Sequence, residues 1–167
     1  TGEGALVAVI DTGIDLSHPQ LSTQIAFNEG EIPGNGIDDD NNGWVDDYAG
    51  YNFAAGTPDV YDEVGHGTHV AGIIAARHEA GPVKGLAPGA KILPLKFLSA
   101  DGGSLGDALA AMKYAADFAD KRGKPLIINA SWGGGNCSDT FVDIMTHLQN
   151  RRTLFVVAAG NSGTDID

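Results

Sequence analysis

The chain has 167 residues, of which 43% are hydrophobic and 19% charged, a composition typical of a globular protein with its own core. Its 22 acidic and 10 basic residues give a formal net charge of −12, which argues against nucleic acid or an anionic membrane surface as a partner. No apolar run approaches the roughly 18 residues needed to cross a bilayer, and the residues from Thr1 onward do not have the basic and apolar regions expected of a signal peptide. We therefore expect a soluble chain, either a mature protein or a piece of one.

Four apolar runs predict strands buried on both faces, and three segments with helical spacing lie between them. In chain order these elements are a strand over 5–10, a helix over 66–78, a strand over 91–97, a helix over 105–122, a strand over 125–130, a helix over 138–150 and a strand over 153–159. Such alternation predicts an α/β fold of three layers, a doubly wound and mostly parallel sheet with helices on both faces.

The segment 28–53 interrupts this alternation, because it is rich in Gly, Asp and Asn. It is too polar for a core element and too long for a routine connection. We therefore expect one domain over 1–167 that carries an acidic insertion over 28–62. Cys137 is the only cysteine, which excludes an internal disulfide and a cysteine-rich zinc cluster.

Polar residues follow three of the predicted strands. Asp11, Ser131 and Asn161 each come after the end of a strand, and His66 opens the first predicted helix. Loops and helix N-termini converge beyond the carboxyl ends of parallel strands, so the topology alone brings these four residues to one edge of the sheet.

These residues have both chemical and plain structural interpretations. A buried aspartate can orient an imidazole and stabilise its cation, although Asp11 in "DTG" also suits a turn. His66, flanked by glycines that leave room for a substrate backbone, can act as a general base, or it can be a cap or a packed residue. The amide of Asn161 can donate to a developing oxyanion, or it can close a turn in "NSG".

His69 lies three residues after His66, which raises the alternative of a zinc-dependent hydrolase that uses both imidazoles. The spacing is shorter than that of the H-E-x-x-H arrangement, and no nearby cysteine completes a site. The sequence therefore favours a packed His69 that makes local hydrogen bonds.

Five segments, in this order, resemble the subtilisin-like serine proteases, the subtilases. They are "VAVIDTGIDLSHP" (7–19), "GHGTHVAG" (65–72), "GLAPGAKILPLK" (85–96), "NASWGG" (129–134) and "VVAAGNSG" (156–163). Each is suggestive alone, whereas five in sequence are highly specific. The resemblance covers nearly the whole chain outside 28–62, and it implies a subtilisin-like fold that is incomplete.

The resemblance implies a secreted serine endopeptidase that acts through an acyl-enzyme, with Asp11 as the triad aspartate, His66 as the general base and Asn161 as an oxyanion donor. An extended peptide substrate would pair with an edge segment and place one side chain between two walls. The residues implied are Gly102, Gly103 and Ser104 in the edge segment, and Ser131, Trp132, Gly133, Ala159 and Gly160 in the walls. Trp132 either narrows the pocket or packs beneath it.

The nucleophile of the family lies in a Gly-Thr-Ser segment, and no such segment occurs here. We therefore expect the chain to be the N-terminal part of a protease, truncated on its C-terminal side, inactive alone, and partnered by the missing C-terminal part that carries the serine. The alternative is a non-catalytic, protease-like module that binds peptides or a partner through the same edge.

The acidic insertion predicts a structural calcium site. The stretch "DDDNNGWVDD" matches the first, third, fifth, sixth and ninth positions of an EF-hand-like loop, whereas Ala49 stands at the twelfth, where a glutamate is usual. The family's own calcium site is not expected, because Gln20 replaces its aspartate. The predicted ligands are Asp38, Asp40, Asn42, the carbonyl of Trp44, Asp46 and, in place of the glutamate, Asp47. The alternative is a solvated acidic loop.

Overall fold

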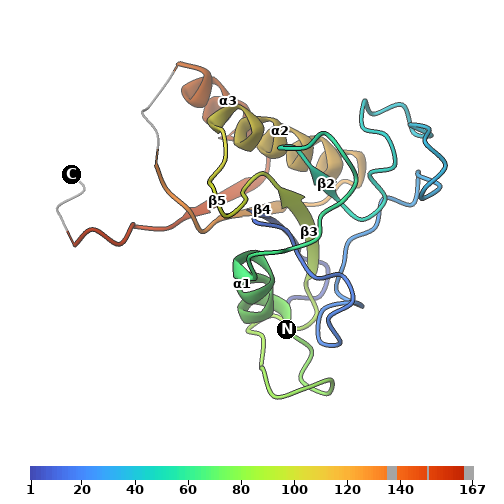
Figure 1. Ribbon diagram of the computed structural model, residues 1–167, viewed down its shortest axis with the longest axis vertical. Coiled ribbons are helices and arrows are strands. Elements are labelled where there is room, and N and C mark those ends of the chain that lie inside the picture. Colours follow the sequence, from blue (N-terminus) through green and yellow to red (C-terminus); the bar gives the residue numbers. More distant parts are fainter. Residues whose placement is uncertain (135–138, 150, 164–167) are drawn as a thin grey trace.

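One parallel sheet organises the computed structural model, which describes residues 1–134, 139–149 and 151–163 (Figure 1). Its strand order is β2-β3-β1-β4-β5, and every pairing between these strands is parallel. The elements are β1 (Leu6–Asp11), β2 (Tyr51–Asn52), α1 (His66–Ala75), β3 (Lys91–Lys96), α2 (Leu105–Lys121), β4 (Leu126–Ala130), α3 (Asp139–Gln149) and β5 (Thr153–Val157).

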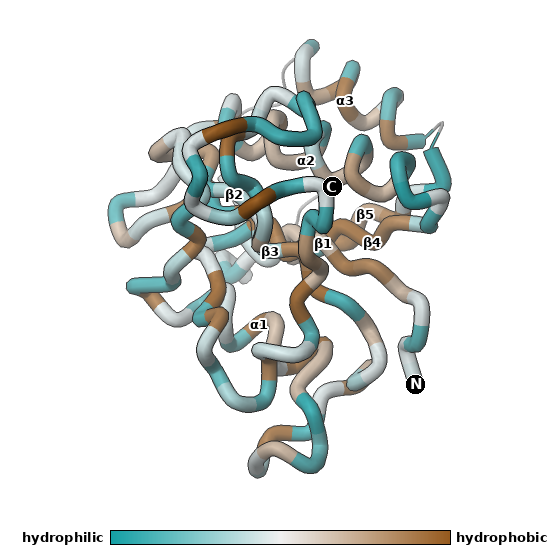
Figure 2. Tube along the Cα trace, turned by 90° about the vertical axis from the view of Figure 1, so that its right-hand side faces the viewer, coloured by the Kyte–Doolittle hydropathy of each residue, from teal (hydrophilic) through white to brown (hydrophobic). Residues whose placement is uncertain are grey.

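Helices cover both faces of this sheet. Val7 and Val9 of β1 belong to the apolar cluster beneath α1. Leu6, Ala8 and Ile10 belong to the larger cluster beneath α2 and α3. Successive side chains of a strand point to opposite faces, which explains why the whole of β1 is apolar and buried up to its last residue. The prediction of a three-layer α/β fold is confirmed, and hydrophobic stretches of the trace lie along the central strands (Figure 2).

Two predicted elements end at least two residues earlier than expected. Helix α1 stops at Ala75 instead of residue 78, because Ala76 leaves the helical region with a ψ of 129°. Strand β5 stops at Val157 instead of residue 159. None of the described helices combines the length and the apolar character that a membrane span requires.

The expectation that 28–53 contributes nothing to the core is wrong at the C-terminal end of this segment. Strand β2 pairs with β3, and Tyr51 and Phe53 are buried in the main cluster. Trp44 packs edge-on against both rings, with centroid distances of 4.9 Å. Gly50 lets the chain at the start of β2 approach β3 closely, since a Cβ there would lie 1.9 Å from the carbonyl oxygen of Pro94 in β3.

A buried carboxylate ties the insertion to α2. Asp47 is fully buried and accepts hydrogen bonds from Tyr114 Oη at 2.6 Å, Asn28 Nδ2 at 2.7 Å and Asn42 Nδ2 at 2.8 Å. Burial and the neighbouring Asp47 carboxylate hold the pKa of Tyr114 well above its usual value, so the phenol remains a donor. The insertion is therefore an ordered extension at the β2 edge, seen as blue-to-cyan loops in Figure 1.

Candidate active site

Asp11 and His66 meet at the carboxyl edge of the sheet. Asp11 ends β1 and His66 begins α1, and His66 Nδ1 lies 2.7 Å from Asp11 Oδ1. The aspartate is fully buried, whereas the histidine side chain is 48% exposed. A carboxylate only accepts hydrogen bonds, so Nδ1 carries the proton and the neutral ring has its lone pair on Nε2. This arrangement presents an oriented base to the surface.

Backbone and side-chain donors hold the end of β1 in place. Asp11 Oδ1 also accepts from the N–H of Thr12 at 2.7 Å. Lys96, which lies opposite Asp11 in the register of β1 and β3, is buried and donates to the carbonyl oxygen of Thr12. It also donates to Glu63 Oε2 at 2.6 Å, and this hydrogen bond holds the pKa of the Glu63 carboxyl below its usual value. In the sequence, a lysine at the end of an otherwise apolar strand was the feature that could have indicated that Lys96 supports the end of β1.

The two glycines beside His66 have different functions. Gly65 has a φ of 90°, and a Cβ there would meet nothing within 4 Å, as expected for a residue that leaves space for a ligand. Gly67 instead packs against β1, since a Cβ there would lie 2.2 Å from the carbonyl oxygen of Gly13 and 3.2 Å from Asp11 Cβ. The second glycine therefore allows the close approach of helix and strand, and the expectation that it makes room for substrate is corrected.

The expectation that His69 is packed is also wrong. Its side chain is exposed and has no hydrogen bond among the described residues. Helix α1 buries Gly67, Ala71 and Ala75, which are spaced four residues apart, so His69 falls on a different face. Neither His66 nor His69 belongs to a group of three possible metal ligands within the described parts of the chain. The zinc alternative therefore has no support in the described site.

The predicted edge segment lies between β3 and α2. Gly102 forms a tight turn in which its N–H and carbonyl both pair with Ser99, at 3.1 and 3.0 Å. Ser104 caps α2, because its Oγ accepts from the N–H of Asp107 at 3.1 Å. Gly103 is exposed, and its backbone groups have no partner among the described residues. Of the three predicted residues, Gly103 has the backbone groups that remain available for an extended peptide.

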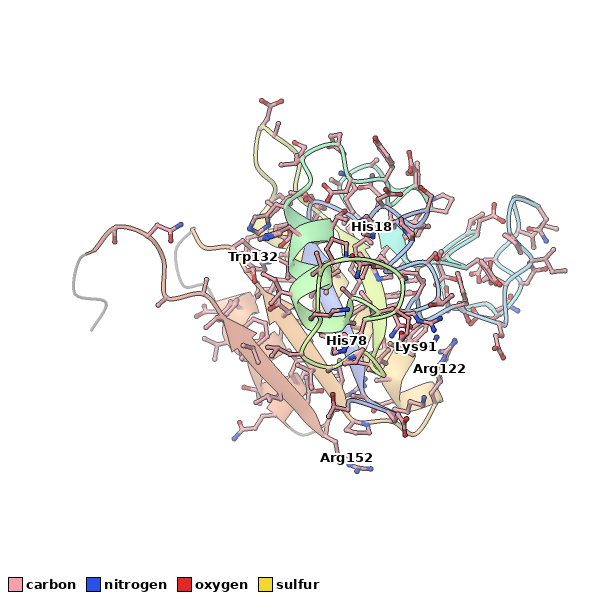
Figure 3. The ribbon with its side chains drawn as sticks, turned by 90° about the horizontal axis from the view of Figure 1, so that it is seen from below. His18, His78, Lys91, Arg122, Trp132 and Arg152 are labelled. Carbon is pink, nitrogen blue, oxygen red and sulfur yellow. The ribbon has the colours of Figure 1, made fainter. Side chains whose placement is uncertain are left out.

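The first predicted pocket wall follows β4. Ser131 Oγ accepts from Asn129 Nδ2 at 2.8 Å, and Gly133 is exposed. Trp132, labelled in Figure 3, donates from Nε1 to the carbonyl oxygen of Ile10 at 2.7 Å and packs edge-on against Phe97 at 4.7 Å. Trp132 therefore packs beneath the site and braces the residue that precedes Asp11.

The second predicted wall follows β5. Ala159, Gly160 and Asn161 are exposed, and no hydrogen bond joins the Asn161 side chain to Asp11 or His66. The chain beyond β5 extends away from the other elements in both views (Figure 1, Figure 3). Strand β4 lies between β5 and β1 in the sheet, and within the described residues no hydrogen bond joins the second wall or the oxyanion candidate to the Asp11–His66 pair.

The acidic insertion gathers three carboxylates. Single oxygen atoms of Glu31, Asp38 and Asp40 all lie within 4.8 Å of one another. Glu31 is buried and accepts from the N–H of Asp40 at 3.0 Å and of Asp46 at 3.1 Å. Sequence reasoning missed Glu31, because it precedes the twelve-residue window. An all-oxygen donor set of this kind suits a hard cation such as Ca²⁺.

The other predicted calcium ligands have different partners. The carboxylate of Asp46 accepts from the N–H groups of Asn35 and Gly36, at 3.0 and 2.9 Å. Asp47 is turned inward to the hydrogen bonds described above. Asn42 donates to Asp47, and its Oδ1 accepts from the N–H of Trp44 at 2.8 Å. The described geometry therefore favours Glu31, Asp38 and Asp40 over the complete EF-hand-like set.

The sheet and its edge define an α/β protein with an aspartate–histidine pair suited to activating a nucleophile. A profile of the subtilase family matches residues 2–166, and the chain belongs to this family. It is 37% identical over 162 residues to "Subtilisin-like protease 1" of Plasmodium berghei (strain Anka), an alignment that covers 95% of this chain and 26% of the relative.

Two further similar proteins are also longer than this chain. "Extracellular protease" of Xanthomonas campestris pv. campestris is 38% identical over 181 residues, covering 99% of this chain and 31% of the relative. The solved structure of "Sphericase" matches with a TM-score of 0.74 and 29% identity, covering 98% of this chain and 48% of that chain. The chain thus spans less than a third of these two sequence relatives and about half of the structural one.

Proposed function

We propose that the chain forms the N-terminal part of the peptidase domain of a subtilisin-type serine endopeptidase. The observation that supports this most directly is the 2.7 Å hydrogen bond between His66 Nδ1 and the buried Asp11. The pair occurs in a chain of the subtilase family, at the sheet edge where catalytic groups gather in parallel folds.

In this proposal His66 Nε2 takes the proton of a serine hydroxyl as its oxygen attacks the peptide carbonyl carbon. The imidazolium then gives that proton to the leaving amine, which produces an acyl-enzyme that water hydrolyses with His66 again as base. Asp11 holds the ring and stabilises its cation, and Asn161 donates to the oxyanion. The serine belongs to a Gly-Thr-Ser segment outside these 167 residues, so the chain alone is inactive.

The substrate is an extended peptide. The backbone groups of Gly103 have no partner within the described parts of the chain, so such a strand would bond with them, beside Gly102 and Ser104. Selectivity arises between the wall of Ser131 and Gly133, braced by Trp132, and the wall of Ala159 and Gly160. Backbone pairing supplies affinity without reading the peptide sequence, so these walls determine which side chain is preferred.

The remaining part of the same protease is the proposed partner, and it would cover β5. Leu154 is 60% exposed and Val156 is 44% exposed, and both side chains point to the same face of this strand, which is unusual for a parallel sheet. Secretion is the proposed localisation, since one relative is named an extracellular protease.

Calcium is the proposed structural cofactor of the acidic insertion. Glu31, Asp38 and Asp40 would hold the ion. A bound Ca²⁺ would neutralise the mutual repulsion of these carboxylates and stabilise the loop. The ion takes no part in the proposed peptide chemistry.

Labelling with a fluorophosphonate probe tests the function. A longer protein that carries the Gly-Thr-Ser segment should be labelled on that serine and should hydrolyse peptides. Peptide binding without labelling would instead favour the alternative of a non-catalytic module that uses the same edge.

A further inference from the structure

Helix α1 begins without a capping side chain of its own. Gly65 occupies the N-cap position, and no side chain at that position caps the helix. The first N–H groups of a helix have no intrahelical partner, and an N-cap side chain normally accepts from the second or third of them. His66 is the first residue of this helix. The groups that satisfy these N–H donors therefore also control where the imidazole lies.

Asp62 and Thr12 supply the missing acceptors. Asp62 Oδ2 accepts from the N–H of Thr68 at 2.8 Å, and Thr12 Oγ1 accepts from the N–H of Gly67 at 2.9 Å. Thr12 Oγ1 in turn donates to Asp62 Oδ1 at 2.8 Å. Thr12 directly follows Asp11, so these bonds join the end of β1 to the first turn of α1.

Asp62 is the centre of this network. Beyond the bonds to Thr12 and Thr68 N, its carboxylate accepts from the N–H groups of Val64 at 3.2 Å and Gly65 at 2.8 Å, and from Thr68 Oγ1 at 2.7 Å. Thr68 Oγ1 also accepts from the N–H of Asp15 at 3.0 Å. Asp62 is only 8% exposed, which is unusual for a carboxylate unless its hydrogen bonds are satisfied.

The charge of Asp62 is also suited to this position. Burial raises the pKa of its carboxyl, but the hydrogen bonds from Thr68, Gly65 and Thr12 outweigh burial and hold the pKa below its usual value. The positive end of a helix dipole disfavours an imidazolium. Asp62 and the buried Asp11 supply negative charge at this end, whereas the nearby Glu63 is already paired with Lys96.

We infer that Asp62 is a positioning residue for His66. Through Thr12 and Thr68 it holds the first turn of α1 against the end of β1, and so keeps the imidazole within hydrogen-bond distance of Asp11. No hydrogen bond joins Asp62 to the His66 side chain in the described structure, so its action passes through the backbone of the helix start. The consequence for catalysis rests on the proposed function, whereas the effect on the His66–Asp11 hydrogen bond does not.

Proton NMR of the 167-residue chain tests the inference without any activity. The Nδ1 proton shared by His66 and Asp11 should give a downfield resonance that is protected from exchange with water. Asp62→Asn and Thr12→Val should each weaken or abolish this resonance, and Thr12→Val does so without changing any charge. Thr12→Ser keeps the hydroxyl and should restore the resonance. Asp59→Asn is the matched control, because Asp59 is exposed and its carboxylate accepts, among the described residues, only from the N–H of Tyr61.

Kinetics of the longer protease supply the second readout. Asp62→Asn and Thr12→Val should lower kcat by roughly 10- to 100-fold with little change in KM, because a base displaced by a fraction of an ångström loses alignment while the peptide-binding edge is unchanged. The inference is overturned if both variants lower only the melting temperature and keep the Nδ1 resonance and kcat. If the resonance responds as expected while the unaltered protein cleaves no peptide, the positioning role stands and the proposed function fails.

Discussion

Replacing Gly67 by alanine should separate His66 from Asp11. The added Cβ would lie 2.2 Å from the carbonyl oxygen of Gly13. The backbone fixes the positions of both atoms, so no change of side-chain rotamer can relieve the clash. Carbon and oxygen in van der Waals contact lie roughly 3.2 Å apart or more, so the start of α1 must move by about 1 Å. A displacement of about that size takes the 2.7 Å His66–Asp11 bond out of hydrogen-bond range.

We expect Gly67→Ala to lower kcat of the longer protease by about 100-fold, since a misplacement of about 1 Å can cost that much. The assay is hydrolysis of a chromogenic peptide, with the Nδ1 proton resonance of the 167-residue chain measured in parallel. Gly72→Ala is the matched control, because a Cβ at Gly72 of the same helix meets nothing within 4 Å. Retention of both kcat and the resonance in Gly67→Ala would refute the reasoning.

Three further predictions concern stability. Tyr114→Phe deprives the buried Asp47 of a donor and should lower the free energy of unfolding in urea by about 1.5 to 3 kcal/mol. The control Tyr61→Phe, at an exposed tyrosine, should leave this free energy almost unchanged. Equal losses in the two variants would show that the Tyr114–Asp47 hydrogen bond does not stabilise the fold. Ca²⁺ should raise the melting temperature of the chain, and Asp38→Asn should reduce that rise; an identical rise in the variant would exclude Asp38 as a ligand. The folded pKa of Asp62 lies below its unfolded value, so its stabilising effect is fully present above the unfolded pKa of about 3.9 and is lost as the pH falls through the folded pKa. The difference in melting temperature between the unaltered chain and Asp62→Asn should therefore shrink as the pH is lowered below about 4, and a constant difference would contradict this assignment.

Long apolar elements were predictable from the sequence because burial on both faces leaves a strong pattern. The runs at 5–10 and 125–130 and the helix at 105–122 correspond closely to β1, β4 and α2. Strand β2 was missed because it has only two residues and follows a polar loop. Its signal was aromatic: Tyr51 and Phe53 alternate with a polar residue, as in a strand at a sheet edge.

The Asp11–His66 pair was predictable because strand ends and helix starts meet at one edge of a parallel sheet. Asp62 was not predicted, since its role depends on partners at Thr12 and Thr68 that the fold brings together from distant parts of the chain. A glycine at the N-cap with an aspartate three residues earlier was the available sign. The sequence predicted the edge of the sheet at which Asn161 lies but not its distance from His66, because β5 has no described neighbour on its far side.

The central claim is that His66 is the base of a peptidase, and its most direct test is kcat of the longer protease after His66→Ala. His69→Ala is the matched control, since His69 lies on the same helix and its side chain is exposed. We predict that His66→Ala lowers kcat by several orders of magnitude with the fold retained, whereas His69→Ala remains close to the unaltered enzyme. Comparable turnover in the folded His66→Ala protein would contradict the account.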